Sequence, residues 1–313
     1  MSSDSPIEIV GLRKEYGQFV AVNNLDFSVK KNSFTGFLGP NGAGKSTTLK
    51  ILTHLINASA GKAYLHGVDV ALDPKKALSG VGTVVETPEF YTYLTPRETM
   101  RYIGEILGMN REAIASETDA ILEKVKMSGW ADKRIGTFSK GMRQRIALGQ
   151  ALMNEPSIII LDEPTSGLDP RGMAETREIL KNLRNGSKDL TVVMSSHLLH
   201  EVSDLCDRVA MINHGTLLIH DETDKLMKTG DTRKIAAKLK DTPTRELIEK
   251  VSALDNVVSA ERFGNDIEIG FKGDMDSRAV LFRDLGLLNA GIYGLSEEDE
   301  LETTYLNLIA ESR

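Results

Sequence analysis

The chain has 313 residues, of which 38 are Lys or Arg and 45 are Asp or Glu, so its formal net charge is −7. A hydrophobic fraction of 41% is ordinary for a globular protein. The acidic balance disfavours broad nucleic-acid binding, and the single cysteine, Cys206, excludes an internal disulfide. No run approaches the ~18 apolar residues of a membrane-spanning helix, and the N-terminus lacks an apolar signal core. We therefore expect a soluble cytosolic protein.

Short apolar strands alternate with helical patterns through the first part of the chain. The expected strands, in chain order, are 20–29, 34–38, 157–161, 190–194 and 208–212. The expected helices are 45–55, 97–107, 111–126, 140–153, 171–184 and 198–206. This alternation predicts an α/β fold with a mainly parallel sheet.

The last part of the chain has a different composition. Residues 231–313 carry 11 basic and 17 acidic side chains, whereas residues 1–230 carry 27 and 28, so we place a domain boundary near 228–231. The expected strands in this part are 234–240, 257–263, 266–271 and 292–295. The expected helices are 245–254, 277–287 and 300–311. The order βαββαβ plus a closing helix predicts a small ferredoxin-like α+β unit.

A glycine-rich turn between the strand at 34–38 and the helix at 45–55 matches the phosphate-loop pattern G-x-x-x-x-G-K-[ST]. With the next residue, its members are Gly39, Pro40, Asn41, Gly42, Ala43, Gly44, Lys45, Ser46 and Thr47. The glycines let successive N–H groups surround phosphate oxygens at a helix N-terminus. We expect Lys45 to reach the β- and γ-phosphates and Ser46 to bind Mg²⁺. A chance glycine turn is the alternative, which the flanking strand and helix disfavour.

Two carboxylates, Asp162 and Glu163, directly follow the apolar strand at 157–161. Ligands of such folds bind at the C-terminal edge of the sheet, where these side chains emerge. We expect Asp162 to hold Mg²⁺ and Glu163 to orient and deprotonate an attacking water. The alternative is a solvated pair that caps the strand.

With three further segments, these residues resemble the ATP-binding cassette (ABC) ATPases over residues 7 to about 225. The first segment, similar to the signature Leu-Ser-Gly-Gly-Gln, comprises Phe138, Ser139, Lys140, Gly141 and Met142. Ser139 is a good helix N-cap, and it and Gly141 are the positions that match. In the family this motif contacts the γ-phosphate bound to a second copy, so that two ATP molecules lie between two subunits. An ordinary capped helix is the alternative.

The other two segments contain Asp169 and His197. The sequence Ser-Gly-Leu-Asp at 166–169 is similar to the D-loop of the family, which implies that Asp169 helps build the paired interface. His197 follows the strand at 190–194 and resembles the switch histidine, which touches the γ-phosphate and helps hold the attacking water. A plain turn and a structural histidine are the respective alternatives.

Two more positions follow from the resemblance. Tyr16 matches the aromatic residue that stacks on adenine, with a surface-strand tyrosine as the alternative. Glu86 stands where most members have a glutamine that reaches Mg²⁺ and links ATP to the transport partner. The segment 86–95 looks most like the ATPases of bacitracin and lantibiotic self-protection exporters. Residues 299–308 look like the closing helix of accessory domains in these subunits.

The resemblance implies a P-loop ABC ATPase domain over residues 1–230, with a helical signature subdomain at about 87–155, and a small C-terminal α+β accessory domain over 231–313. It implies an ATP-hydrolysing exporter subunit that uses Mg²⁺ and dimerises, as a homodimer, around two ATP. The motor would drive a separate transmembrane permease from the cytoplasmic face of the membrane, with no nucleic acid as partner. The main alternative is a non-transport ABC ATPase acting on DNA or ribosomes, which the single phosphate loop and acidic tail disfavour. A small-molecule phosphotransferase would leave residues 139–144 and His197 unexplained.

Overall fold

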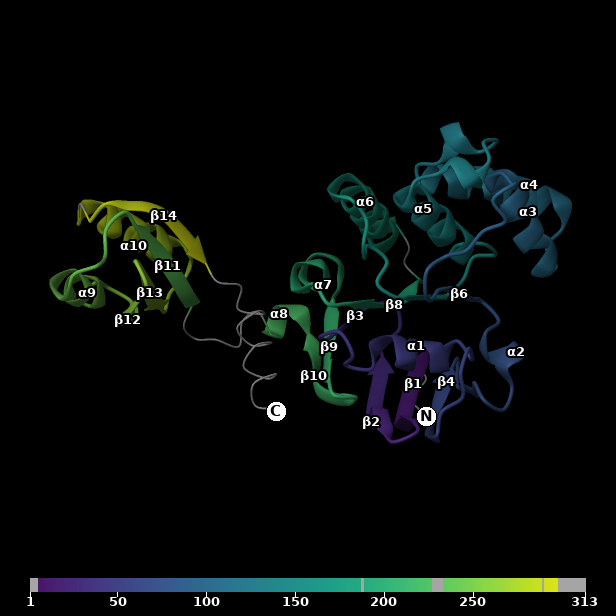
Figure 1. Cartoon of the computed structure of the whole chain (residues 1–313), viewed down its shortest axis with the longest axis horizontal. Coiled ribbons are helices and arrows are strands. Elements are labelled where there is room, and N and C mark those ends of the chain that lie inside the picture. The colour runs from purple at the N-terminus through teal and green to yellow at the C-terminus, as the bar shows by residue number, and fades with distance from the viewer. Residues whose placement is uncertain (1–4, 187–188, 227–232, 289, 298–313) are drawn as a thin grey trace. The chain divides into compact units, whose positions relative to one another are not determined.

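The structure, a computed structural model, describes residues 5–186, 189–226, 233–288 and 290–297. The chain divides into two compact units, Met1–Thr223 and Asp224–Arg313 (Figure 1). Each unit has its own sheet structure and its own buried core. The predicted joint near 228–231 and the predicted closing helix at 299–308 lie outside the described residues.

A mainly parallel sheet forms the centre of the first unit. Within the described residues its strand order is β10-β9-β3-β8-β7-β6, and only β10 runs antiparallel to its neighbour. The strands are β3 (Phe34–Leu38), β6 (Val81–Val84), β7 (Ile158–Leu161), β8 (Thr191–Ser196), β9 (Arg208–Asn213) and β10 (Thr216–Glu222). All residues of β3, β7 and β8 are buried, which is why β7 is an unbroken aliphatic run. The predicted α/β fold class is confirmed.

A second, antiparallel sheet packs below the first. Its strands are β1 (Ile7–Tyr16), β2 (Phe19–Val29), β4 (Ala60–Leu65) and β5 (Val68–Asp69), in the order β2-β1-β4-β5. The strand predicted at 20–29 is therefore present, but it does not belong to the parallel sheet. Its alternation of buried and exposed residues is typical of a sheet with one face on the core and the other in water.

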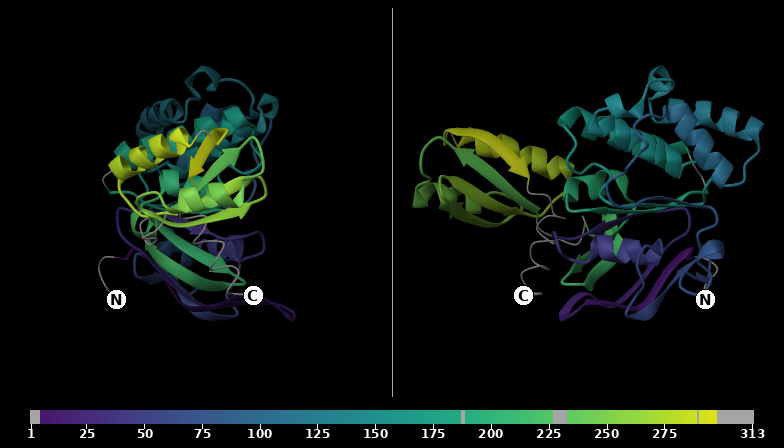
Figure 2. Two further views of the ribbon diagram at one scale, coloured as in Figure 1. Left: turned by 90° about the vertical axis from the view of Figure 1, so that its left-hand side faces the viewer. Right: turned by 45° about the vertical axis from the view of Figure 1, so that its right-hand side comes forward.

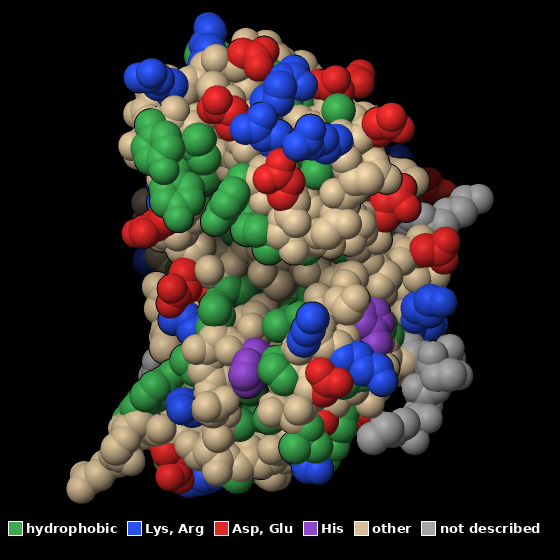
Figure 3. All heavy atoms as spheres, turned by 90° about the vertical axis from the view of Figure 1, so that its right-hand side faces the viewer, with side chains coloured by type: hydrophobic (Ala, Val, Ile, Leu, Met, Phe, Trp, Pro, Cys, Tyr) green, Lys and Arg blue, Asp and Glu red, His purple; other side chains and the backbone are tan. Residues whose placement is uncertain are grey.

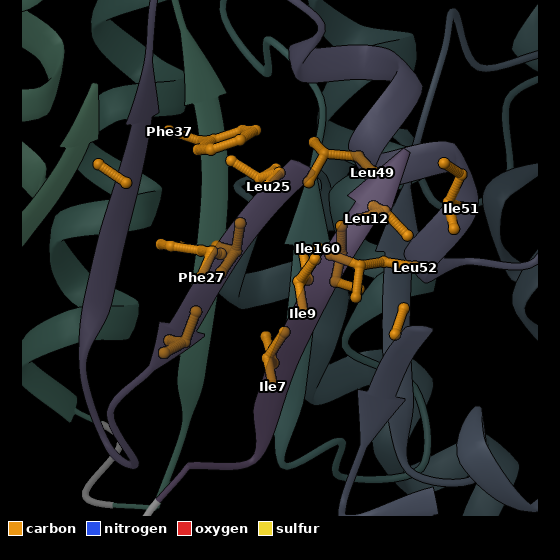
Figure 4. Close-up of a cluster of buried hydrophobic side chains, with 14 of the residues drawn as sticks. Ile7, Ile9, Leu12, Leu25, Phe27, Phe37, Leu49, Ile51, Leu52 and Ile160 are labelled. Atoms are coloured by element: carbon orange, nitrogen blue, oxygen red, sulfur yellow. The ribbon is translucent and has the colours of Figure 1, made fainter. Parts of the chain in front are cut away.

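The main core lies between these two sheets and encloses α1 (Lys45–Leu52). Figure 4 shows side chains of β1, β2 and α1 converging with Ile160 of β7. Residues drawn there include Ile7, Ile9, Leu12, Leu25, Phe27, Phe37, Leu49, Ile51 and Leu52. Because α1 follows the glycine-rich turn directly, this core holds the turn against both sheets.

Helices cover the opposite side of the parallel sheet from α1 (Figure 1). They are α5 (Lys140–Ala151), α6 (Pro170–Gly186) and α7 (Leu199–Leu205), whereas α3 (Pro96–Ile106) and α4 (Arg111–Lys124) pack against each other and α5. A short helix, α2 (Pro74–Ala77), and 3₁₀ turns at Ser128–Trp130 and Ile135–Thr137 complete the unit. Thr95 and Glu98 form a reciprocal capping box that starts α3. A cap of this kind satisfies N–H groups that have no partner within the helix, so it fixes where the helix begins.

Within the described residues, the second unit is an antiparallel sheet with helices α9 and α10 (Figure 2). After α8 (Thr223–Leu226), its elements are β11 (Arg233–Leu239), α9 (Arg245–Ser252), β12 (Val257–Phe263), β13 (Asp266–Phe271), α10 (Met275–Leu287) and β14 (Ile292–Glu297). The strand order β12-β13-β11-β14 places the first and third strands of the unit in the middle, as the βαββαβ pattern predicts. Among the described residues, no helix has both the length and the apolar character needed to cross a bilayer.

Truncation of Leu49, which is fully buried on α1, should destabilise the first unit. We expect Leu49→Ala to lower its free energy of unfolding by about 2–5 kcal/mol, because the site loses apolar contacts and retains a cavity. The only tryptophan, Trp130, lies in this unit, so its fluorescence during urea denaturation reports the change. The matched control is Leu72→Ala at a residue 79% exposed, where the change should stay within about 0.5 kcal/mol. Equal effects of the two substitutions would contradict the assigned core.

Candidate functional site

The glycine-rich turn closes tightly where β3 meets α1. Gly44 is the N-cap of α1, and its φ of 103° lies in the left-handed region. A Cβ atom at Gly44 would lie 2.4 Å from the carbonyl oxygen of Ala21 in β2. Both the backbone conformation and the close approach therefore require glycine here. The turn leaves the first N–H groups of α1 directed outward, where such a helix end binds anions.

Lys45 lies inside this turn. Its side chain is buried, and Nζ donates hydrogen bonds to the carbonyl oxygens of Gly39 (2.8 Å) and Pro40 (3.1 Å). Nζ also lies 3.6 Å from Oε1 of Glu163. Burial lowers the pKa of Lys45 below that of an ordinary lysine, and the carboxylates of Glu163 and Asp162 partly oppose this shift. The ammonium group of Lys45 is thus a desolvated hydrogen-bond donor that the carbonyl groups of the turn hold in place.

Asp162 connects the glycine-rich turn to the end of β8. Its Oδ1 accepts hydrogen bonds from Ser46 Oγ at 3.1 Å and from Ser195 Oγ at 2.6 Å. Ser195 Oγ in turn accepts a hydrogen bond from the backbone N–H of Glu163 at 2.8 Å. Sequence reasoning missed Ser195. Ser195 directly follows the predicted strand at 190–194. Because this strand runs parallel to 157–161, both end at one edge of the sheet, which could have indicated that Ser195 lies near Asp162.

Glu163 lies between two other predicted site residues. Its Oε1 is 3.2 Å from Nδ1 of His197 and 3.6 Å from Nζ of Lys45. The φ of Glu163 is 44°, a left-handed conformation that is uncommon for a side chain of this size. Strained conformations of this kind cluster at functional sites and persist only where the surroundings hold them. The predicted catalytic pair therefore meets in one place, beside the phosphate turn.

Oxygen donors suited to magnesium converge at Ser46 and Asp162. Mg²⁺ usually takes one or two carboxylates and completes its shell with water and substrate phosphates. The hydroxyl and carboxylate thus fit a metal that arrives with a nucleotide.

Glu86, which the resemblance implies can approach Mg²⁺, lies beside α1, and its role as a metal ligand stays a prediction. Its carboxylate forms an ion pair with Lys50 of α1, and this partner raises the pKa of Lys50. Lys50 is four residues beyond Ser46, so the two lie on the same face of α1. Glu86 is 58% exposed and has a φ of 72°. The ion pair ties the loop after β6 to the helix that carries Ser46.

Two aromatic residues line the cleft beside the phosphate turn. Tyr16 and Phe19 are opposite one another in the β1–β2 hairpin, and both border the cleft together with Asn41, Gly42 and residues of α1. Both rings are largely exposed, and Lys14 Nζ lies 5.1 Å from the centre of the Tyr16 ring. An exposed ring of this kind can stack on a planar base. The sequence analysis predicted Tyr16 and missed Phe19. Phe19 follows Tyr16 after a two-residue turn, and this spacing could have indicated that the two rings lie together.

The predicted signature residues line a second cleft. Ser139 caps α5 by accepting a hydrogen bond from the N–H of Met142 at 3.2 Å. This cleft, about 410 Å³ in volume, is lined by Ser139, Gly141, Met142, Asp169, Trp130 and neighbouring charged residues. It has no lining residue in common with the cleft at the phosphate turn. Lys140 Nζ lies apart from it and donates a hydrogen bond to the carbonyl oxygen of Ser166 at 3.1 Å.

The chain is similar to known ATP-binding subunits of transporters. The family model described as ABC transporter matches residues 22–166. The bacitracin transport ATP-binding protein BcrA of Bacillus licheniformis is 38% identical over 222 residues, which cover 71% of both chains. The lantibiotic transport ATP-binding protein SrtF of Streptococcus pyogenes is 34% identical over 70% of this chain and 91% of its own.

Solved structures agree with the sequence comparisons. A structure of an ATP-binding subunit of an ABC transporter covers 72% of this chain and 93% of its own, with a TM-score of 0.64 and 25% identity. A dimeric bacterial ABC transporter cassette shares the fold, with a TM-score of 0.62 over 69% of this chain and 98% of its own. The chain therefore belongs to the family of ABC transporter ATP-binding proteins. It is the subunit that binds and hydrolyses ATP, and subunits of this family dimerise and pair with a permease.

Substitution of Gly44 should disrupt the phosphate turn. We expect Gly44→Ala to weaken ATP binding at least about tenfold, because the added Cβ displaces the N–H groups that face the phosphates. The strained φ should also cost about 1–3 kcal/mol of stability. Titration with a fluorescent ATP analogue and urea denaturation measure the two effects. Gly129→Ala, at an open position without a positive φ, is the control and should change neither quantity.

Proposed function

We propose that two copies of this chain close around two ATP molecules and power export through a separate permease. The observation that carries the proposal is the separation of the two clefts within one unit. The first cleft is bordered by Lys45 and Glu163, whereas Ser139 and Asp169 line the other. A signature cleft that does not reach its own phosphate turn is suited to contact a nucleotide held by a second copy. The proposed partner is therefore another molecule of this chain.

The geometry at the phosphate turn supports a division of roles. Lys45 would exchange its two backbone carbonyl partners for phosphate oxygens, which are stronger acceptors. Ser46 and Asp162 would hold Mg²⁺, which neutralises charge on the phosphates when it is bound. Glu163 would accept a proton from the attacking water, and His197, 3.2 Å away, would position that water and the γ-phosphate.

The loop after β6 and helix α3 carry a group of exposed aromatic side chains that supports a permease contact there. Tyr91, Tyr93 and Tyr102 are exposed and form a cluster, with ring centres 5.7 and 6.2 Å apart. Figure 3 shows hydrophobic side chains gathered on the face that includes α3 and α4. An exposed group of aromatic residues is typical of a protein contact. Through Glu86 and Lys50, a permease bound here would act on the helix that carries Ser46.

The proposal also includes two domains, transport out of the cell and a location at the membrane. Residues 1–230 would form the ATPase domain, with the helical signature subdomain at about 87–155, and residues 231–313 an accessory domain. The relatives named for bacitracin and lantibiotic transport support export, and the linearmycin resistance protein LnrL of Bacillus subtilis is a third such relative, at 34% identity. The dimer would lie at the cytoplasmic face of the membrane, bound through the permease.

Removal of the proposed base should separate ATP binding from hydrolysis. We expect Glu163→Gln to retain ATP binding and to lower kcat by about 10²–10⁴-fold, because the amide cannot accept the proton of water. His197→Ala should lower kcat as well. Phosphate release and equilibrium binding of ATP are measured on the same preparation. Glu112→Gln on the exposed start of α4 is the control. Near-normal hydrolysis by Glu163→Gln would remove Glu163 from its proposed role.

Dimer dependence gives the second test. At low protein concentration, the specific activity of the wild-type chain should rise with concentration, because only the paired form is complete. Ser139→Arg should leave ATP binding to one copy intact and abolish this rise, since a bulky cation blocks the signature cleft. The measurement is a concentration series of ATPase rates alongside the sedimentation of each variant with ATP. Full ATPase activity of a dilute monomer would contradict the two-copy mechanism.

A further inference from the structure

Helix α7 carries a buried carboxylate, Glu201, that belongs to none of the sequence motifs described above. We infer that Glu201 is a positioning residue that couples two loops of the site. One is the D-loop, residues 166–169, with Thr165 directly before it, and the other is the histidine turn, residues 196–198. The inference rests on the proposed roles of His197 and of the dimer.

Glu201 touches both loops directly. Its Oε1 accepts a hydrogen bond from Thr165 Oγ1 at 2.5 Å, and its Oε2 accepts one from Ser196 Oγ at 3.0 Å. All three side chains are at most 2% exposed. Burial of a carboxylate is costly unless hydrogen bonds compensate for it, and the other buried residues of α7, Val202 and Leu205, are apolar. A carboxylate at this position is therefore explained better by the two hydroxyl groups that it holds than by packing.

The bond to Ser196 sets the conformation around His197. Ser196 Oγ also accepts a hydrogen bond from the backbone N–H of Leu198 at 2.9 Å, which closes a turn across His197. A hydroxyl has a single hydrogen to donate. The carbonyl oxygen of Leu198, at 3.3 Å, is the other acceptor within reach of that hydrogen, and the contact with Glu201 is the shorter of the two. A hydrogen directed at Glu201 leaves a lone pair of Ser196 Oγ for the N–H of Leu198. The carboxylate thus fixes the turn whose imidazole lies 3.2 Å from Glu163.

The bond to Thr165 reaches the segment that faces the second copy. Thr165 directly precedes the D-loop, and its carbonyl oxygen accepts a hydrogen bond from the N–H of Leu168 in that loop at 3.3 Å. Asp169, at the other end of this loop, lines the signature cleft. A displacement of the D-loop by the partner copy would therefore pull on Thr165, and through Glu201 on the histidine turn.

Helix α7, which carries Glu201, is held closely against the parallel sheet. It packs directly on β3, where a Cβ atom at Gly36 would lie 2.5 Å from Cγ1 of Val202, the residue next to Glu201. Such close packing leaves the helix little freedom to follow one loop without the other. Glu201 therefore holds the D-loop and the histidine turn in one fixed relation.

The test is Glu201→Gln in the full-length chain. The amide keeps the shape of the carboxylate, but an NH₂ group replaces one of the two oxygens, so one of the hydroxyls faces a donor instead of an acceptor. We expect kcat to fall about tenfold, with KM for ATP within about twofold and the thermal midpoint within a few degrees. Asp204→Asn on the same helix, at a half-exposed ion pair with Lys181, is the matched control and should leave kcat unchanged.

A double-mutant cycle identifies the route of the effect. Thr165→Val should lower kcat in the same way, and the double variant Thr165→Val/Glu201→Gln should lose no more than the worse single variant. Should Glu201→Gln not fold, Thr165→Val tests the same link by itself. Wild-type kcat in either variant, fully additive losses, or a fall in kcat matched by the loss of ATP binding would overturn the inference.

The variant His197→Ala distinguishes failure of this inference from failure of the proposed function. If His197→Ala itself hydrolyses ATP normally, the proposed role of His197 fails, and the coupling has no catalytic target. If His197→Ala is impaired while Glu201→Gln is not, only the role of Glu201 is refuted.

Discussion

The phosphate turn, the carboxylate pair and the histidine turn follow β3, β7 and β8, which end at one edge of the parallel sheet. The parallel register aligns Leu38 with Ser196 and Leu161 with Met194. Because both faces of these strands are buried, their polar side chains can emerge only at the ends. The phosphate turn, the carboxylates after β7 and the histidine turn after β8 are neighbours for this reason. The core between the sheets, which holds α1, keeps that edge in place.

Several features of this edge are unfavourable by themselves. Lys45 is desolvated, Glu163 has a left-handed backbone, and Glu201 is a carboxylate buried beneath the site. Each is held by specific partners from another strand end or loop. Groups that specific partners hold in this way are pre-organised. Substitution of a supporting partner is therefore expected to affect turnover more than folding.

Local patterns were sufficient for most elements. The aliphatic run of β7, the capped start of α5 and the βαββαβ order of the second unit were predicted with ends close to those observed. The assignment of residues 19–29 to a separate antiparallel sheet was not predictable. A strand pattern states which residues alternate but not which strands pair. Residues 19–29 pair with 7–16 in a hairpin, and 7–16 pair in turn with 60–65, farther along the chain.

By itself, the sequence determined the phosphate turn, the carboxylate pair Asp162 and Glu163, and His197, because each depends on residue types at short spacing beside a recognisable strand. Only the tertiary structure decided the groups that support them. Ser195 beneath Asp162, Lys50 opposite Glu86 and Glu201 between two loops make contacts over 33, 36 and 36 residues. Contacts of that range arise from how strands align and helices pack, and no local pattern encodes them.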